Sequence, residues 1–147
     1  MPTADRDFIY LTIQQICEMN RQLIGRFGGA QFIAPDNLRN SATIEIALDT
    51  IEHGVFGDQQ FDTVPKKAAK LGWEIIHNHP FNDTNKRTGA ISVRALIRLN
   101  GHRIAATDDD VVELINNTAA GSIDYEQFES WWIDHCEEEA QNSGSVI

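Results

Sequence analysis

Residues 79–89 read His-Pro-Phe-Asn-Asp-Thr-Asn-Lys-Arg-Thr-Gly, and residues 90–99 read Ala-Ile-Ser-Val-Arg-Ala-Leu-Ile-Arg-Leu. The first run combines an imidazole, a carboxylate, amides and two cations, whereas the second is rich in apolar side chains. The second run predicts a buried helix, and the first predicts the polar loop that leads into its N-terminus. Free N–H groups and the helix dipole at such an N-terminus attract anions. The stretch therefore predicts the centre of the fold and an active site that handles an anion.

The rest of the chain predicts more helices, because apolar residues recur near a 3.6-residue period and capping signals precede them. Gly28-Gly29 is expected to end the first helix, and Pro65 falls in the first turn of the third. Gly101 is a good C-cap for the helix after the polar loop. The predicted helices run from about Phe8 to Gly25, from Asp36 or Asn37 to His53, from Thr63 to His77, from Asn85 to Asn100, from Thr107 to Ala119 and from Asp124 to Glu139.

The connections between these helices are short. The segment Gly54–Asp62 has two glycines and no helical period, so it fits either a loose loop or a short hairpin. His102–Ile104 is expected to be a short extended link. We therefore predict a compact all-α domain of about six helices over residues 1–140, followed by a flexible tail over residues 141–147.

Composition narrows the class of protein. A net charge of −10 argues against direct nucleic-acid binding, which needs a basic surface to neutralise phosphates. The chain has neither a signal-peptide pattern nor an apolar run that predicts a membrane span, so a cytoplasmic location is expected. Cys17 and Cys136 are expected to be reduced rather than joined in a disulfide.

His79 and Asp83 are the candidate catalytic residues. Histidine side chains titrate near neutrality, so the neutral imidazole of His79 can take a proton from a hydroxyl group. Asp83 supplies a hard oxygen ligand, and Mg²⁺ is commonly bound by one carboxylate together with substrate phosphates. Asp83 is also well placed to cap the following helix, and both roles stay open.

Asn85, Lys86 and Arg87 are the candidate phosphate ligands. Lys86 and Arg87 fall in the first turn of the predicted helix, where the dipole disfavours cations unless an anion lies beside them. Asn85 adds an amide donor, and the backbone N–H groups of Thr84 to Lys86 could form an anion-binding nest. A base, a metal ligand and a phosphate cradle together predict phosphoryl or nucleotidyl transfer.

Two other polar groups have plainer interpretations. His77 and His79 could suggest a zinc site, but residues two apart on a helix do not face each other. No further ligand pattern completes such a site, so zinc binding is not expected. Arg87, Arg94 and Arg98 share one helix face. We expect Arg94 and Arg98 to pair with some of the many carboxylates.

The polar stretch resembles the core motif of the Fic/Doc family, H-x-F-x-[D/E]-G-N-G-R-x-x-R. Lys86 replaces the second glycine of that motif, and Ala90 replaces its final arginine. Both replacements are typical of the Doc ("death on curing") toxin branch, whose motif is similar to H-x-F-N-D-x-N-K-R-T-A. Gly89 then stands in place of the usual alanine, and Thr84 stands where alanine or glycine is common. The positions that fit the Doc form are His79, Phe81, Asn82, Asp83, Asn85, Lys86, Arg87 and Thr88.

The resemblance extends to Arg26-Phe27-Gly28-Gly29 and Leu99-Asn100-Gly101-His102, and it implies a Fic fold. Doc proteins are toxins of toxin–antitoxin pairs that use ATP to phosphorylate a threonine of elongation factor Tu and so stop translation. Segment Gly54–Asp62 would correspond to the flap that docks the target. A cognate antitoxin would neutralise the toxin by folding a disordered tail against it.

The resemblance also implies a role for each motif residue. His79 would be the base on the target hydroxyl, and Asp83 would help to hold Mg²⁺. Phe81 would anchor the loop in the core. The implied ligands of the ATP phosphates are Asn85, Lys86 and Arg87.

Two other functions stay open. The main Fic branch transfers AMP to protein hydroxyls and uses the arginine that Ala90 replaces here. The inhibitory [S/T]-x-x-x-E-[G/N] motif of that branch is matched only as far as Glu45 in Ser41–Ile46. The third interpretation is a catalytically silent regulator that binds an antitoxin, and intact His79, Asp83 and Arg87 count against it.

Overall fold

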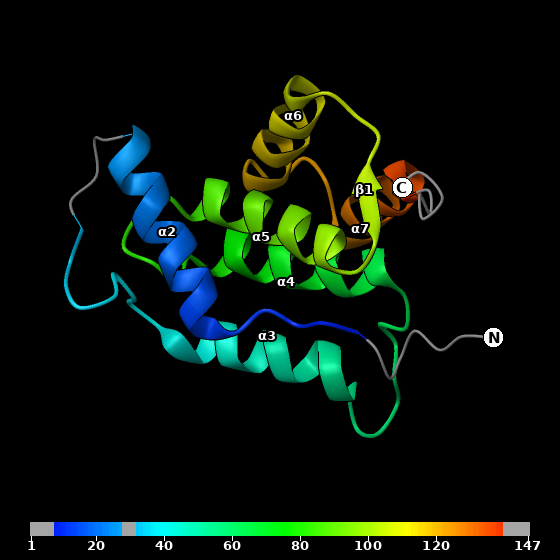
Figure 1. Cartoon of the computed structure of the whole chain (residues 1–147), viewed down its shortest axis with the longest axis horizontal. Helices are drawn as coiled ribbons and strands as arrows, with labels where there is room; N and C mark the ends of the chain where they lie inside the picture. The colour runs from blue at the N-terminus through cyan, green and yellow to red at the C-terminus, as the bar shows by residue number, and fades with distance from the viewer. Residues whose placement is uncertain (1–7, 28–31, 140–147) are drawn as a thin grey trace, which may run out of the picture.

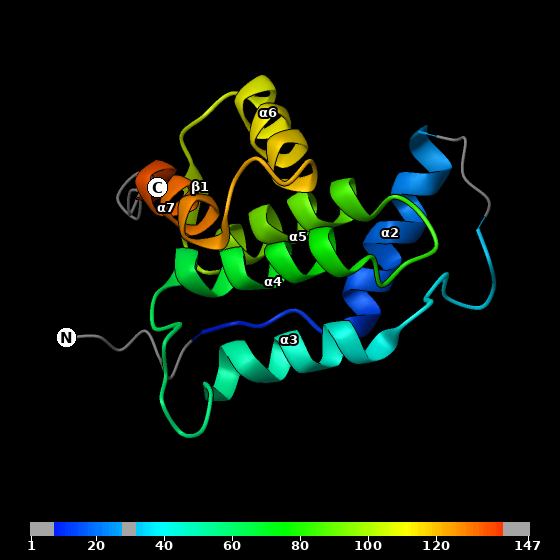
Figure 2. The same cartoon turned by 180° about the vertical axis from the view of Figure 1, so that it is seen from behind.

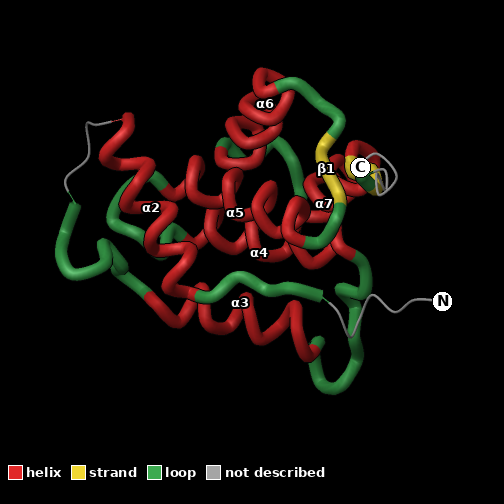
Figure 3. The backbone as a smooth tube through the Cα atoms, viewed as in Figure 1, coloured by secondary structure: helices red, strands yellow, loops and turns green. Residues whose placement is uncertain are grey.

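The computed structural model of the chain describes residues 8–27 and 32–139, and the elements of this part are nearly all helical (Figure 1; Figure 3). The predicted compact all-α class with about six helices is confirmed. The predicted helix end at Gly28-Gly29 and the predicted tail 141–147 lie outside the described residues. The elements are α2 (Ile13–Phe27), α3 (Ser41–His53), α4 (Val64–Asn78), α5 (Asn85–Leu99), β1 (His102–Ile104), α6 (Asp108–Ala119), α7 (Tyr125–His135) and β2 (Cys136–Glu138).

Helices α4 and α5 form the centre of the molecule. They are joined by the short loop 79–84, and they pack together closely because Gly72 and Gly89 meet at their interface. Helix α3 lies along one side of this pair, α6 and α7 lie on the other, and α2 crosses it at the end where the loop lies (Figure 1; Figure 2). The largest fully buried side chains of the core include Ile44, Ile51, Leu71, Ile75, Leu96, Ile97, Phe128 and Trp132. No helix of the described part is long and apolar enough to cross a membrane.

The first helix begins later than the predicted Phe8. Residues 8–12 are extended, because the side chain of Asn100 accepts a hydrogen bond from Ile9 N at 2.7 Å and donates one to Ile9 O at 2.9 Å. Helix α2 then begins after a capping box in which Thr12 and Gln15 each bond the other's backbone N–H. The Thr-x-x-Gln pattern was visible in the sequence, but the apolar residues upstream of it extended the predicted helix.

The start of the second helix was also predicted too early. Asn40 caps α3 by accepting a hydrogen bond from Ala42 N at 3.1 Å, so neither Asp36 nor Asn37 is its N-cap. Asn37 is instead buried, and its side chain bonds Asn20 and the backbone of Ile33.

The C-terminal part contains a small sheet that the sequence did not reveal. The last helix ends at His135 rather than Glu139, and β2 pairs antiparallel with β1, with Arg103 opposite Glu137. The predicted extended link His102–Ile104 is therefore an edge of this sheet. Its pairing partner lies more than thirty residues away, and a pairing at that range is set by tertiary packing rather than by local pattern.

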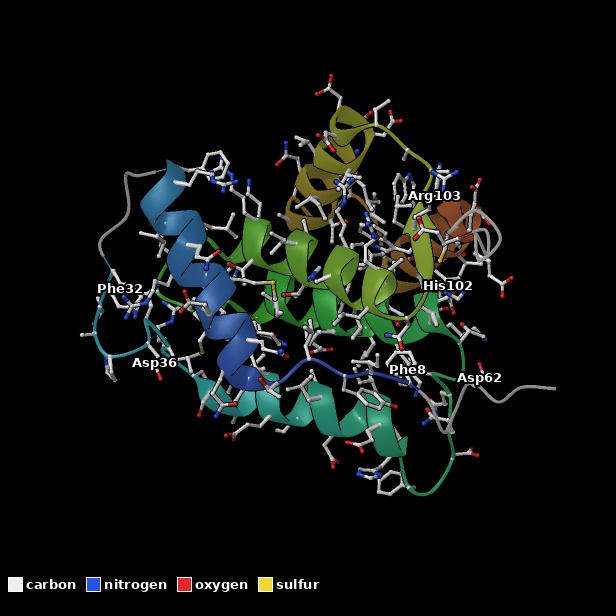
Figure 4. All side chains as sticks on the ribbon, viewed as in Figure 1. Phe8, Phe32, Asp36, Asp62, His102 and Arg103 are labelled. Carbon is white, nitrogen blue, oxygen red and sulfur yellow. The ribbon has the colours of Figure 1, made fainter. Side chains whose placement is uncertain are left out.

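Segment 54–62 contains a tight turn closed by reciprocal hydrogen bonds between Val55 and Asp58. It leads into the N-terminal end of α4, whereas the polar loop follows the C-terminal end of that helix, about 22 Å away for fifteen residues. Figure 4 shows Asp62 on the opposite side of the molecule from Phe32 and Asp36, and Figures 1 and 2 agree. The location expected for a target-docking flap is therefore wrong, because α4 separates this segment from the polar loop.

Both cysteines are free, as expected. Burial and the negative charge of Asp36 raise the pKa of the Cys17 thiol to about 11. Burial and the charge of Glu137 raise the pKa of the Cys136 thiol to about 11. Both side chains are therefore protonated thiols at neutral pH.

Candidate functional site

The polar loop is bounded by two residues in the left-handed backbone conformation. His79 ends α4 with φ 48° and ψ 60°, and Pro80 cannot continue the helix because it has no N–H. Thr84 precedes α5 with φ 67° and makes no side-chain capping bond. The carboxylate of Asp83 accepts a hydrogen bond from Thr84 N at 2.6 Å, so it does not cap the helix interior. The first turn of α5 is therefore left without a side-chain cap.

Phe81 and Asn85 hold the loop in shape. The Phe81 ring is fully buried in the core. The Asn85 side chain accepts a hydrogen bond from Phe81 N at 2.9 Å and donates one to Phe81 O at 3.0 Å. Asn85 lies 8% exposed, with both ends of its amide bonded to this one residue. In this structure its side chain bonds the loop backbone, so a phosphate contact would have to use its remaining amide hydrogen.

A buried polar network, which no sequence pattern indicated, supports the loop from beneath. Asn20 on α2 donates hydrogen bonds to Asp83 O and to Thr88 Oγ1, both at 3.0 Å. Asn37 donates to Asn20 Oδ1 at 2.9 Å, and Asn82 donates to Asn37 O at 3.0 Å through its side chain. Asn20, Asn37 and Thr88 are fully buried, so their bonds fix the loop relative to α2 and to residues 33–38.

The candidate site is an open cavity of about 470 Å³ beside the loop. It brings together the predicted base His79, the predicted metal ligand Asp83 and the predicted phosphate ligands Asn85 and Lys86. It also includes Arg39, which precedes α3 and which sequence reasoning missed because it lies forty residues from His79. The full lining is Arg39, His79, Asn82, Asp83, Thr84, Asn85, Lys86 and Ala119.

Lys86 and Arg87 lead from this cavity into a second one. Lys86 lines both, and its Nζ donates a hydrogen bond to Asn116 Oδ1 on α6 at 3.2 Å. Arg87 lines only the second cavity, which has a volume of about 400 Å³ and includes Ala90. The Arg87 guanidinium lies over the Phe27 ring, 4.1 Å from its centroid. Neither cation forms an ion pair with a described carboxylate.

The other arginines of this helix differ in their contacts. Arg94 pairs with Asp108 at 3.2 Å, as expected. Arg98 is exposed and has no ion pair among the described residues, so the pairing expected for it is not found there.

The donor set fits Mg²⁺ bound mainly by substrate phosphates. The described residues include no group of three or more His, Cys, Asp or Glu side chains that could hold a metal ion by themselves. Asp83 uses one carboxylate oxygen for Thr84 N, and the other has no described protein partner. One free carboxylate oxygen beside a phosphate site is the arrangement in which Mg²⁺ keeps several water ligands.

His77 lies close to the site but belongs to the helix before it. Its ring stacks on Trp73 with centroids 3.8 Å apart. Burial lowers its pKa, the charge of His79 lowers it further, and Glu74 acts in the opposite direction. His77 is therefore neutral at physiological pH, and its packing on Trp73 gives it a structural role.

Comparison with known proteins gives a family match for the chain. The family model described as Fic/DOC family matches residues 10–97, which is more than half of the chain and includes the whole polar loop. A search of curated proteins found no match.

Proposed function

The chain belongs to the Fic/DOC family, and on this basis we propose that it is a cytoplasmic protein kinase toxin that moves the γ-phosphate of ATP to a threonine hydroxyl of elongation factor Tu. Proteins of this family transfer groups to protein hydroxyls and generally take them from nucleotides. The proposal specifies the group transferred, the target and the consequence, which is arrest of translation. A cognate antitoxin would keep the toxin inactive.

The observation that carries the proposal is the shared cavity. His79, Asp83 and Lys86 come from the end of one helix, the loop and the start of the next, and all three line the same space. The N-terminus of α5 opens there without a side-chain cap. A base, a metal ligand, a cation and free helix N–H groups are the parts that phosphoryl transfer uses for positioning and charge stabilisation.

The proposed step transfers one phosphoryl group. The His79 imidazole accepts the proton of the threonine hydroxyl, and the hydroxyl oxygen forms a bond to the γ-phosphorus. The bond between the γ-phosphorus and the oxygen bridging to the β-phosphate breaks, and ADP leaves with that oxygen. Lys86 and the first turn of α5 stabilise the negative charge on the phosphates.

Asp83 would hold Mg²⁺ together with the phosphates, and the metal would supply further charge neutralisation there. The Asp83 backbone is fixed by Asn20, so its carboxylate is presented from a rigid position. Arg87 is held over Phe27, which places a second cation beside Lys86 at the start of α5.

Lys86 and Ala90 favour phosphate transfer over AMP transfer. In the adenylylating branch a glycine and an arginine stand at these positions. Here Lys86 adds a cation to the main cavity, and Ala90 lines the neighbouring one where the arginine side chain would extend. With lysine in place of the glycine and alanine in place of the arginine, the cation that contacts the phosphates stands at a different position. This difference supports transfer of the terminal phosphate.

The test is incubation of the full chain with Mg²⁺, elongation factor Tu and ATP labelled separately at the α or the γ position. Label from the γ position on the target supports the kinase, and label from the α position would replace it with AMP transfer. Absence of label from both positions would contradict enzymatic modification of this target.

His79→Ala should abolish transfer without changing the folded state, because this exposed side chain forms no described hydrogen bond. His53→Ala is the matched control, since His53 is also exposed and lies at the far end of α3. Loss of transfer in both variants would contradict the role of His79 as base.

A further inference from the structure

Arg39 is the residue of the candidate site that neither the motif nor the fold class assigns. It precedes Asn40, the N-cap of α3, and its exposed side chain lines the cavity of His79, Asp83 and Lys86. One backbone hydrogen bond and one side-chain hydrogen bond tie Arg39 to the loop. Arg39 N donates to Pro80 O at 2.7 Å, and Arg39 Nη2 donates to His79 O at 3.1 Å.

These bonds leave most N–H donors of the Arg39 guanidinium without a described partner. An arginine side chain has five N–H donors, and the described contacts of Arg39 use one of them. The remaining donors belong to a group that borders an open cavity rather than a packed interface. A planar fork of donors on a fixed backbone is well suited to phosphate oxygens.

The charge pattern around the cavity points the same way. Several other cations of the described chain pair with carboxylates, as in Lys70–Glu74 at 2.7 Å and Arg103–Glu137 at 2.9 Å. Arg39 and Lys86 form no ion pair with a carboxylate of residues 8–27 or 32–139, although the chain carries a net charge of −10. Two cations that line one cavity and form no ion pair with its carboxylate, Asp83, create a local site for a polyanion.

We propose that Arg39 is a substrate-binding residue that contacts the phosphates of the nucleotide from the side of the cavity formed by residues 37–40. This inference rests on the proposed function for the identity of the ligand as a nucleoside triphosphate. The shared chemistry is a chain of phosphates, and it is independent of which phosphate is transferred.

The experiment measures binding without any target protein. Sodium tripolyphosphate and ATP, each with and without Mg²⁺, are titrated calorimetrically into the full chain and into Arg39→Gln, Arg39→Lys and Arg98→Gln. Arg39→Gln removes the charge and shortens the side chain, so it also loses the bond to His79 O, whereas Arg39→Lys keeps the charge. Arg98→Gln removes the same charge from an exposed position outside the cavity.

Arg39→Gln should weaken binding of both probes roughly ten- to hundredfold, as expected for loss of hydrogen bonds between charged groups. Arg39→Lys should lie between this variant and the wild type, and Arg98→Gln should bind like the wild type. Equal affinity of Arg39→Gln and wild type would overturn the inference. Equal weakening of Arg39→Gln and Arg98→Gln would also overturn it, because only net charge would then matter.

A purely structural role of Arg39 gives a different result. If Arg39 only held the His79 carbonyl, Arg39→Gln would shift the NMR signals of the His79 imidazole in the free protein and leave tripolyphosphate affinity unchanged. That outcome would overturn the proposal. Failure of the wild type to bind either probe would overturn it as well.

The inference and the proposed function fail separately. Arg39-dependent binding of tripolyphosphate without transfer of γ-label would contradict only the kinase. Transfer of γ-label with normal binding by Arg39→Gln would contradict only the role of Arg39.

Discussion

Thr84 shows how single residues of the loop hold an unfavourable backbone conformation. A β-branched side chain at φ 67° is strained, because its Cβ crowds the neighbouring carbonyl. His79, at φ 48°, carries a similar cost at the other end of the loop. Strain of this kind persists where the surroundings over-determine the backbone and is concentrated at functional sites. Here Asn20, Asn37 and Asn85 provide that support.

Thr84→Gly should raise the free energy of unfolding by about 1 kcal/mol, because glycine adopts the left-handed conformation without a Cβ penalty and loses part of this gain to chain entropy. Urea unfolding measures the change. Thr84→Ala is the control, since it removes the hydroxyl but keeps the Cβ. An equal gain in Thr84→Ala would show that the backbone conformation is not the cause.

Asn20 and Asn37 act as a pair within the buried network. Asn20→Ala and Asn37→Gly should each lower the free energy of unfolding by roughly 1–3 kcal/mol, because each leaves buried polar partners without hydrogen bonds. Glycine is used at residue 37 because its φ is 64°. The double variant should cost less than the sum of the two, since their mutual bond can be lost only once.

A double-mutant cycle from urea unfolding tests this coupling. Asn117→Ala on the exposed face of α6 is the control and should change stability by less than about 0.5 kcal/mol. Strict additivity of the Asn20 and Asn37 changes would contradict the network.

At the level of elements, the contact between α4 and α5 sets the distance between the two sides of the site. A Cβ added at Gly72 would overlap Val93 Cγ2, and one added at Gly89 would lie 2.7 Å from Ile76 Cγ1. Gly89 replaces an alanine that the Doc motif usually has, and the packing of Ile76 explains the replacement. The two helices approach closely because each presents a glycine to a large side chain of the other.

Gly72→Ala should lower the free energy of unfolding by roughly 1–3 kcal/mol through overpacking. Gly25→Ala is the control: an added Cβ there meets nothing within 4 Å, so this change should stabilise α2 by roughly 0.5–1 kcal/mol. In a Val93→Ala background the cost of Gly72→Ala should disappear, because the overlapping methyl group is gone. Thermal and urea unfolding report all three effects, and an undiminished cost in that background would contradict the overlap.

At the level of the whole molecule, the net charge of −10 opposes compaction, because the exposed carboxylates repel one another. Raising NaCl from about 0.02 M to about 0.5 M should therefore raise the urea midpoint, since salt screens exposed charges. Glu113→Lys on the exposed face of α6 should show a smaller gain than the wild type. A midpoint that falls with salt would show that attractive ion pairs outweigh the repulsion.

Local signals in the sequence determined most helix boundaries. Helix starts at Thr63, Thr107 and Asp124 were predicted, and the structure confirms them, with these three residues as the N-caps. Each depends on contacts within three or four residues, so its residues determine it wherever the chain folds. The motif of residues 79–89 likewise identified the loop and the family, because its residues are adjacent in sequence.

Tertiary structure decided the features that depend on distant partners. The side chain of Asn100, which is distant in sequence, hydrogen-bonds the backbone of Ile9, so residues 8–12 do not join the first helix. Residues 136–138 pair with β1, so α7 ends before them. Asn20 and Arg39 join the site for the same reason. Their side chains are unremarkable in sequence, and only the packing of α2 and residues 37–40 against the loop brings them to it. The sequence by itself therefore determined the chemistry of the loop, whereas its support and its extra cation come from long-range contacts that no local pattern encodes.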